Sequence, residues 1–288
     1  MTSAWNRFWF RAEPRANFIA ARIIVALTSL WLVLSRPQLP ELLTWPDAFW
    51  LHANGWLRAR FLIGGLPYAI ELALYIVLMV ALLLTALGRF TAASAFTAAI
   101  LLYHFAAFED IISSSSGPFF RGFTACISCL FVIAFSQHDD DDSRWPLALM
   151  RLLVAFTYLL SGISKLRLVG WRWATAANFE GIVAAMVLPD VRPPWSNWFL
   201  GHPLLCWLGA LSGFAMDFLF ISAVFSKRAA RVVVPLTFIA HVVVVKVLGV
   251  VYLAAPLLLL FVNWQWVVDA LRARRGAVAT ASGRDLAQ

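Results

Sequence analysis

The chain has 288 residues, of which 62% are hydrophobic and only 13% are charged, and its formal net charge is +8. A soluble domain carries about 25% charged residues, so this composition excludes an ordinary soluble protein and predicts an integral membrane protein. The basic residues are spread through short segments between apolar runs. That spread is typical of topology signals and lipid-headgroup contacts, and it argues against a nucleic-acid partner.

The two ends of the chain differ from its apolar middle. Residues 1–16 mix aromatic and basic side chains without a long apolar core, so they predict an interfacial amphipathic segment and not a cleaved signal peptide. The transmembrane domain is expected over 17–266. The tail at 267–288 is basic, then small and polar, and is expected to be disordered.

Eight apolar runs predict eight transmembrane helices, because about 20 apolar residues cross a hydrocarbon core of ~30 Å. The first six are expected at 17–34, 68–87, 90–108, 119–135, 145–165 and 203–225. The last run, 232–266, is far longer than one span needs, so we divide it at Gly249 into two spans. The predicted fold class is therefore an all-α, polytopic membrane helix bundle, which we expect in a bacterial inner membrane.

Basic residues orient this bundle. With the N-terminus in the cytoplasm, twelve Lys and Arg residues lie in cytoplasmic segments, eight lie outside, and the remaining three of the 23 lie inside spans. The shortest and most basic turns all fall on the cytoplasmic side, which is where the positive-inside rule puts them. We therefore expect both termini in the cytoplasm.

The fifth predicted span carries a polar stripe. At about 100° per residue, Arg151, Tyr158, Ser161, Gly162 and Lys165 fall on one side of this helix. A charge in hydrocarbon costs several kcal/mol, so such a stripe must face protein or a water-filled cavity. Lys165 is expected where this inner face meets the outer interface of the membrane.

Ionisable residues inside the predicted spans are candidates for function, and depth sorts them into two groups. Those expected near the outer face are Glu71, His104, Lys165 and Lys246, with Tyr252 beside them. Those expected deeper or towards the cytoplasm are Arg22, Arg151, Asp217 and His241.

These residues allow two interpretations. In the structural one they pair and lock the bundle, Asp217 with one of the two arginines and Glu71 with one of the two lysines. In the functional one the outer group performs acid–base chemistry, because a desolvated lysine next to another cation can act as a base.

Three weaker patterns favour ordinary structure. The pair Cys126 and Cys129 forms a CxxC, but both fall mid-span among small residues, which favours helix packing over redox chemistry. The Asp run at 139–142 is typical of a solvated loop, and the Ser run at 113–116 lacks a GxSxG context. Zinc-binding spacings and nucleotide-binding glycine loops do not occur, so no metal site is predicted.

The order of four features resembles the HTTM family, the membrane domains similar to vitamin K-dependent gamma-glutamyl carboxylase. These features are an Arg-containing first span, FIAARIIVALTSLWLVL, the sequence GISKL at 162–166 followed by Trp171, the acidic Asp217 in the next span, and the late His241. The likeness covers about residues 15–266. It implies that Lys165 is the base that deprotonates vitamin K hydroquinone, and hence a quinone-like ligand.

This chain departs from the family at two places. Ser164 stands where the carboxylase has a second lysine, and the outer loop at 109–118 has no His where the carboxylase has a functional one. The chain also ends about where the carboxylase's large soluble region begins. Carboxylation of proteins is therefore not expected.

Three functions stay open. The first is a membrane enzyme or redox partner that binds a quinone-like or isoprenoid lipid, with Lys165 as base and Glu71, His104 or Lys246 assisting. The second is a non-catalytic assembly or maturation factor that binds lipid or a partner protein. The third is a small-solute transporter with a midplane site at Asp217 and His241, which the lack of a visible inverted repeat disfavours.

Overall fold

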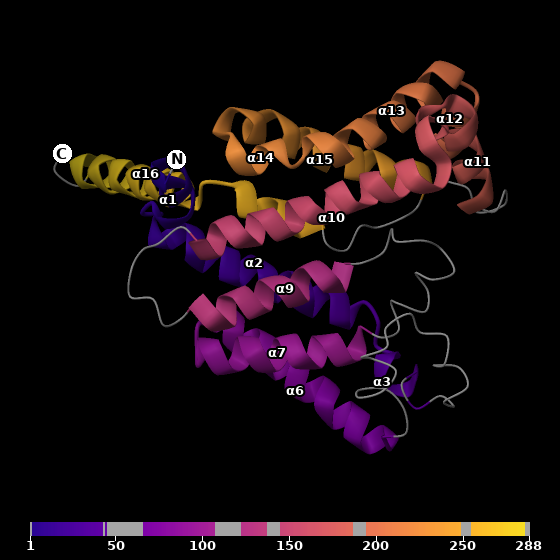
Figure 1. The fold of residues 1–288 in the computed structure, drawn as a ribbon. Coiled ribbons are helices and arrows are strands. Elements are labelled where there is room, and N and C mark those ends of the chain that lie inside the picture. Colours follow the sequence, from indigo (N-terminus) through magenta and orange to yellow (C-terminus); the bar gives the residue numbers. More distant parts are fainter. Residues whose placement is uncertain are drawn as a thin grey trace.

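The computed structural model describes residues 2–42, 44, 66–106, 122–136, 145–186, 194–248 and 255–285. The elements of these residues are all helices, as the composition predicts (Figure 1). Several predicted features lie outside the described residues, namely Tyr252, the division point Gly249, the loop at 109–118 and the Asp run at 139–142.

Four helices of the described residues are long and apolar enough to cross a membrane. They are α2 (Arg15–Leu34), α6 (Tyr68–Leu87), α10 (Trp145–Val169), which runs on into η3 (Gly170–Ala174), and α15 (Lys227–Leu248). Their outward faces keep large apolar side chains exposed, for example Val80 and Leu83 on α6 and Phe238 and Ile239 on α15. Such surfaces suit lipid and not water, so these helices make the chain a membrane protein.

Three shorter apolar helices coincide with three more of the predicted spans. They are α7 (Thr91–Phe105), α9 (Gly122–Phe135) and α13 (Pro203–Leu219), the last followed by α14 (Ser222–Phe225). At about 1.5 Å per residue each is shorter than the hydrocarbon core, so their lengths alone do not establish a crossing.

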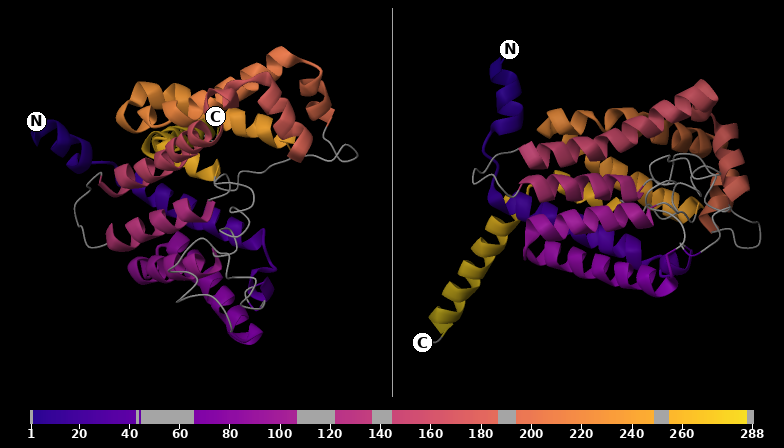
Figure 2. Two further views of the ribbon diagram at one scale, coloured as in Figure 1. Left: turned by 45° about the vertical axis from the view of Figure 1, so that its right-hand side comes forward. Right: turned by 60° about the horizontal axis from the view of Figure 1, so that its bottom comes forward.

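The C-terminal part differs from the sequence-based expectation. Within the eighth predicted span, Ala255–Phe261 form a short 3-10 helix, η5, which at about 2.0 Å per residue covers less than half of a hydrocarbon core. From Trp264 onward the span belongs to the next helix. The tail that we expected to be disordered continues as helix α16 (Trp264–Asp285), which projects away from the bundle (Figure 2). Its Ala, Leu and Arg residues have high helix propensity, which accounts for the helix.

Short helices lie at the ends of the bundle. They are α1 (Thr2–Phe10), α3 (Leu39–Leu42), α11 (Ala176–Met186) and α12 (Pro194–Leu200). On α1, Trp5 and Phe10 are exposed, while the ring of Phe8 stacks on that of Phe225 with centroids 5.4 Å apart. This combination fits the predicted interfacial segment.

Helix α10 separates two groups of helices (Figure 1). On one side α2, α6, α7 and α9 pack on one another, and on the other side α13 packs on α11 and α15. Helix α10 contacts α9 and α2 in the first group and α13 in the second, and η5 lies against it as well. The polar stripe of α10 therefore has protein on both flanks.

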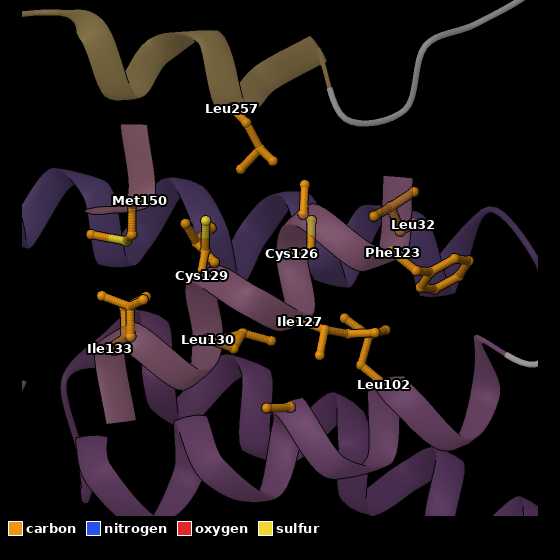
Figure 3. Packing of buried hydrophobic residues seen from close by; sticks show 14 of the residues in the cluster. Leu32, Leu102, Phe123, Cys126, Ile127, Cys129, Leu130, Ile133, Met150 and Leu257 are labelled. Atoms are coloured by element: carbon orange, nitrogen blue, oxygen red, sulfur yellow. The ribbon is translucent and has the colours of Figure 1, made fainter. Parts of the chain in front are cut away.

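The apolar core is densest where α9 meets its neighbours. The side chains of Cys126 and Cys129 are fully buried among apolar side chains such as Leu102 and Leu130 (Figure 3). Small side chains at such positions let helices approach closely. The burial of both side chains agrees with the packing interpretation of the CxxC.

Candidate functional site

The polar stripe of α10 meets polar residues of two other helices. Lys165 Nζ donates a hydrogen bond to Asp217 Oδ2 of α13 over 2.6 Å, and Ser161 Oγ donates to the same oxygen over 3.4 Å. About two turns back along α10, the hydroxyl of Tyr158 lies 2.7 Å from His241 Nε2 of α15. The predicted inner face of this helix is confirmed, and it joins three helices through side chains.

A glycine makes the approach of α13 to α10 possible. A Cβ atom at Gly162 would lie 2.9 Å from the Cβ of Asp217 and 2.9 Å from the ring of Phe218. Any larger residue would hold the helices apart and lengthen the contact between Lys165 and Asp217. Gly162 therefore belongs to the site although it carries no functional group.

A second glycine turns the chain so that a tryptophan lies over Lys165. Gly170 has φ of 65°, a left-handed conformation that favours glycine, and it ends α10. The chain turns into η3, which brings the ring of Trp173 to 5.0 Å from Lys165 Nζ. The ammonium group thus has a carboxylate and an aromatic face as neighbours.

The pair is largely withdrawn from the surface. The side chains of Lys165 and Asp217 are 11% and 9% exposed. Removing two charges from water costs several kcal/mol for each ion, so the pair forms because each group compensates the other. Loss of either partner would leave an uncompensated charge within the helices.

Aromatic contacts orient the second pair of the site, that of Tyr158 and His241. The ring of Tyr158 packs against Phe220 with centroids 4.3 Å apart and stacks on the imidazole of His241 at 5.8 Å. Because the ring is held from two sides, its hydroxyl points at His241. One partner donates and the other accepts, depending on the imidazole tautomer.

The predicted outer group does not assemble into one site. Glu71 Oε2 lies 2.8 Å from His104 Nε2, so these two residues pair with each other on α6 and α7. Their side chains are 1% and 7% exposed, which places them in the core of the other helix group. Lys246 is exposed on α15 and belongs to neither pair.

The pairing predicted by the structural interpretation is wrong for both acidic residues. Asp217 pairs with Lys165 and not with an arginine, and Glu71 pairs with a histidine and not with a lysine. Arg151 instead donates from Nε to the carbonyl of Leu260 over 2.8 Å and lies 3.9 Å from Glu13.

The other arginine, Arg22, packs against the C-terminal end of α6. Its guanidinium would lie 2.6 Å from a Cβ atom at Gly88, the left-handed residue that caps this helix. A cation is favourable there because the helix dipole is negative at its C-terminus. This contact supports the structural interpretation of Arg22.

Sequence reasoning missed one residue of the site and chose its neighbour. Trp171, which the sequence suggested as a binding or structural residue, is exposed and meets Phe214 edge-on at 5.6 Å, whereas Trp173 covers Lys165. Glu13, the partner of Arg151, was also missed. Among the described residues, no group of three or more His, Cys, Asp and Glu side chains is arranged to hold a metal ion.

No protein-family model, curated protein or solved structure matches the chain.

Proposed function

We propose that this chain is an eight-span membrane protein of the HTTM type that binds a quinone-like lipid at Lys165 and Asp217 and transfers a proton to or from its hydroxyl group. The observation that carries the proposal is the 2.6 Å pair between Lys165 and Asp217, covered by Trp173 and placed next to the pair of Tyr158 and His241. Placing ionisable groups inside membrane-spanning helices costs free energy, which favours a function for them.

Orientation follows from the basic residues. With both termini in the cytoplasm, α10 begins on the inner side and Lys165, twenty residues after Trp145, lies about 30 Å further along, near the outer interface. A lipid ligand would reach it from the outer leaflet.

The pair is proposed to work as one acid–base unit. In the resting state Lys165 is an ammonium group and Asp217 a carboxylate. Transfer of one proton from Nζ to the carboxylate leaves an amine, which accepts the hydroxyl proton of the ligand. The products are a ligand oxyanion beside the Lys165 ammonium and a protonated Asp217, so one proton has moved from ligand to carboxylate.

Two features favour an aromatic ligand with an apolar tail. The ring of Trp173 offers a face on which a flat ring can stack beside Nζ. Along the same end of α10, Ile163 and Leu166 are exposed and suit an isoprenoid chain. The resemblance of GISKL and the following Trp to the carboxylase family supports the same ligand class.

The other two functions differ in what they ask of these residues. An assembly factor needs the pair of Lys165 and Asp217 only as a lock between helices. A transporter needs Asp217 and His241 open to solute, but Lys165 and Tyr158 already occupy them. The geometry therefore favours the lipid-binding function over transport.

The test has two stages. Protein purified in mild detergent is extracted with organic solvent, and the ultraviolet spectrum of the extract is searched for quinone. A short-chain hydroquinone is then added to delipidated protein, and its deprotonation is followed by the red shift of its absorption. We expect co-purified quinone and a red shift in the wild type.

Variants assign the roles. Lys165→Ala and Lys165→Arg should bind hydroquinone without the red shift, because an alanine has no basic group and a guanidinium keeps its proton. Arg167→Ala, which removes an exposed cation two residues further on, should behave as wild type. Full deprotonation by Lys165→Arg, or no quinone binding by the wild type, would leave the structural lock as the better explanation.

A further inference from the structure

A pocket of about 960 Å³ lies at the opposite end of α10 from Lys165. Arg151 lines it, fourteen residues and therefore about 21 Å before Lys165 along the helix. The other walls come from the segment between α1 and α2, from α14 and the start of α15, and from the end of η5. Its volume is in the range of ligand-binding sites.

The pocket is strongly basic. Four cationic side chains line it, those of Arg11, Arg151, Lys227 and Arg231, against one carboxylate, that of Glu13. Asn17 donates a hydrogen bond to this carboxylate over 2.9 Å, and Arg151 lies 3.9 Å from it, so Glu13 is already engaged. The ion pairs of the described residues involve none of the other three cations.

Three helices begin at this pocket. Pro14 precedes the first residue of α2, Lys227 is the first residue of α15, and Asn263 precedes α16, and all three line the cavity. Each helix N-terminus carries a partial positive charge. Side chains cap part of it, since the N–H of Gln265 in α16 donates to Asn17 Oδ1 over 3.0 Å and that of Ala229 in α15 donates to Ser226 Oγ over 3.3 Å. These charges add to those of the side chains, so the pocket attracts an anion from several directions.

The remaining wall is apolar. Val224, Val234 and Phe261 line the cavity beside the cations. A pocket that combines arginines with apolar side chains suits a ligand with a phosphate group and a hydrocarbon portion, since arginine binds phosphate through parallel hydrogen bonds. We propose that this pocket binds the phosphate group of an anionic membrane lipid, with the glycerol and the first carbons of the chains against the apolar wall.

The proposal is tested by thermal unfolding of the full chain in neutral detergent after delipidation. Phosphatidylglycerol should raise Tm by about 5 °C, whereas phosphatidylcholine with the same chains and inorganic phosphate should each raise it by less than about 1 °C. An equal effect of both lipids would overturn the anionic preference. An equal effect of inorganic phosphate would identify a soluble phosphate ligand and overturn the lipid.

Charge-neutral variants locate the site. The double variant Lys227→Gln with Arg231→Gln should weaken phosphatidylglycerol binding about tenfold, because it removes two charge-assisted contacts. The control Arg228→Gln removes an exposed cation of the same helical turn that does not line the pocket, and it should change binding less than about twofold. If phosphatidylglycerol binding were weakened equally in the double variant and in Arg228→Gln, or in neither, the lipid would bind elsewhere.

Discussion

The structure contains two buried pairs of one acidic and one basic side chain, one between α6 and α7 and one between α10 and α13, and they differ in their surroundings. Glu71 and His104 are joined between consecutive helices and are enclosed by the apolar core. Lys165 and Asp217 come from helices further apart in the chain, and a serine, a tryptophan and a glycine surround them. The distances, 2.8 and 2.6 Å, hardly distinguish the pairs. Function is therefore better inferred from what surrounds a pair than from the pair itself.

The largest effect is expected in the enclosed pair. Glu71→Ala should lower the free energy of unfolding by about 3–5 kcal/mol, because His104 loses its partner in the core and Glu71 leaves a cavity. Hydroquinone binding should be unchanged once the protein is folded. Thermal unfolding in detergent and the absorption assay measure the two quantities. Loss of hydroquinone deprotonation in a folded Glu71→Ala protein would erase the distinction between the pairs.

Asp217→Asn should lower the free energy of unfolding by less, about 3 kcal/mol at most, since this pair is less enclosed than that of Glu71 and His104. In contrast to Glu71→Ala, this change should also abolish the red shift of bound hydroquinone. An Asp217→Asn protein that deprotonates hydroquinone as well as wild type would limit Asp217 to a structural role.

Gly162→Ala tests the close approach of α10 and α13. The added Cβ would lie 2.9 Å from the Cβ of Asp217, so the helices must separate, and we expect a loss of about 1–3 kcal/mol in unfolding free energy. Gly213→Ala is the matched control, because a Cβ there has no neighbouring atom within 4 Å and alanine favours a helix. Equal stability of the two variants would contradict the contact.

The smallest effect is expected at the second pair of the site. Tyr158→Phe removes the hydroxyl that lies 2.7 Å from His241 but keeps the ring against Phe220, so the cost should be about 0.5–1.5 kcal/mol. Tyr68→Phe, at an exposed position, should be neutral. Thermal unfolding of the wild type, Tyr158→Phe and Tyr68→Phe measures these differences in stability. A loss of more than about 3 kcal/mol in unfolding free energy would show that the pair of Tyr158 and His241 stabilises the bundle as strongly as that of Glu71 and His104.

Periodicity and hydropathy predicted much of the molecule. The bounds of the second span match α6 residue for residue, and the polar side of α10 faces protein as expected. Partners could not be predicted, because Asp217 is 52 residues from Lys165 and no local rule relates α13 to α10. Trp171 was named because it is the tryptophan that follows GISKL in the family resemblance, whereas the left-handed Gly170 turns the chain so that Trp173 lies over Lys165.

The contact at Gly162 also bears on how the ligand proposed at Lys165 would enter and leave. Since α10 and α13 touch there without room for one more carbon atom, the seam between them does not supply a path to Lys165. Trp173 approaches from another side, on a five-residue turn whose first residue, Gly170, has open space around its Cβ position. For the ligand proposed at Lys165, we therefore expect the residence time to depend on this short turn and not on a separation of the two long helices.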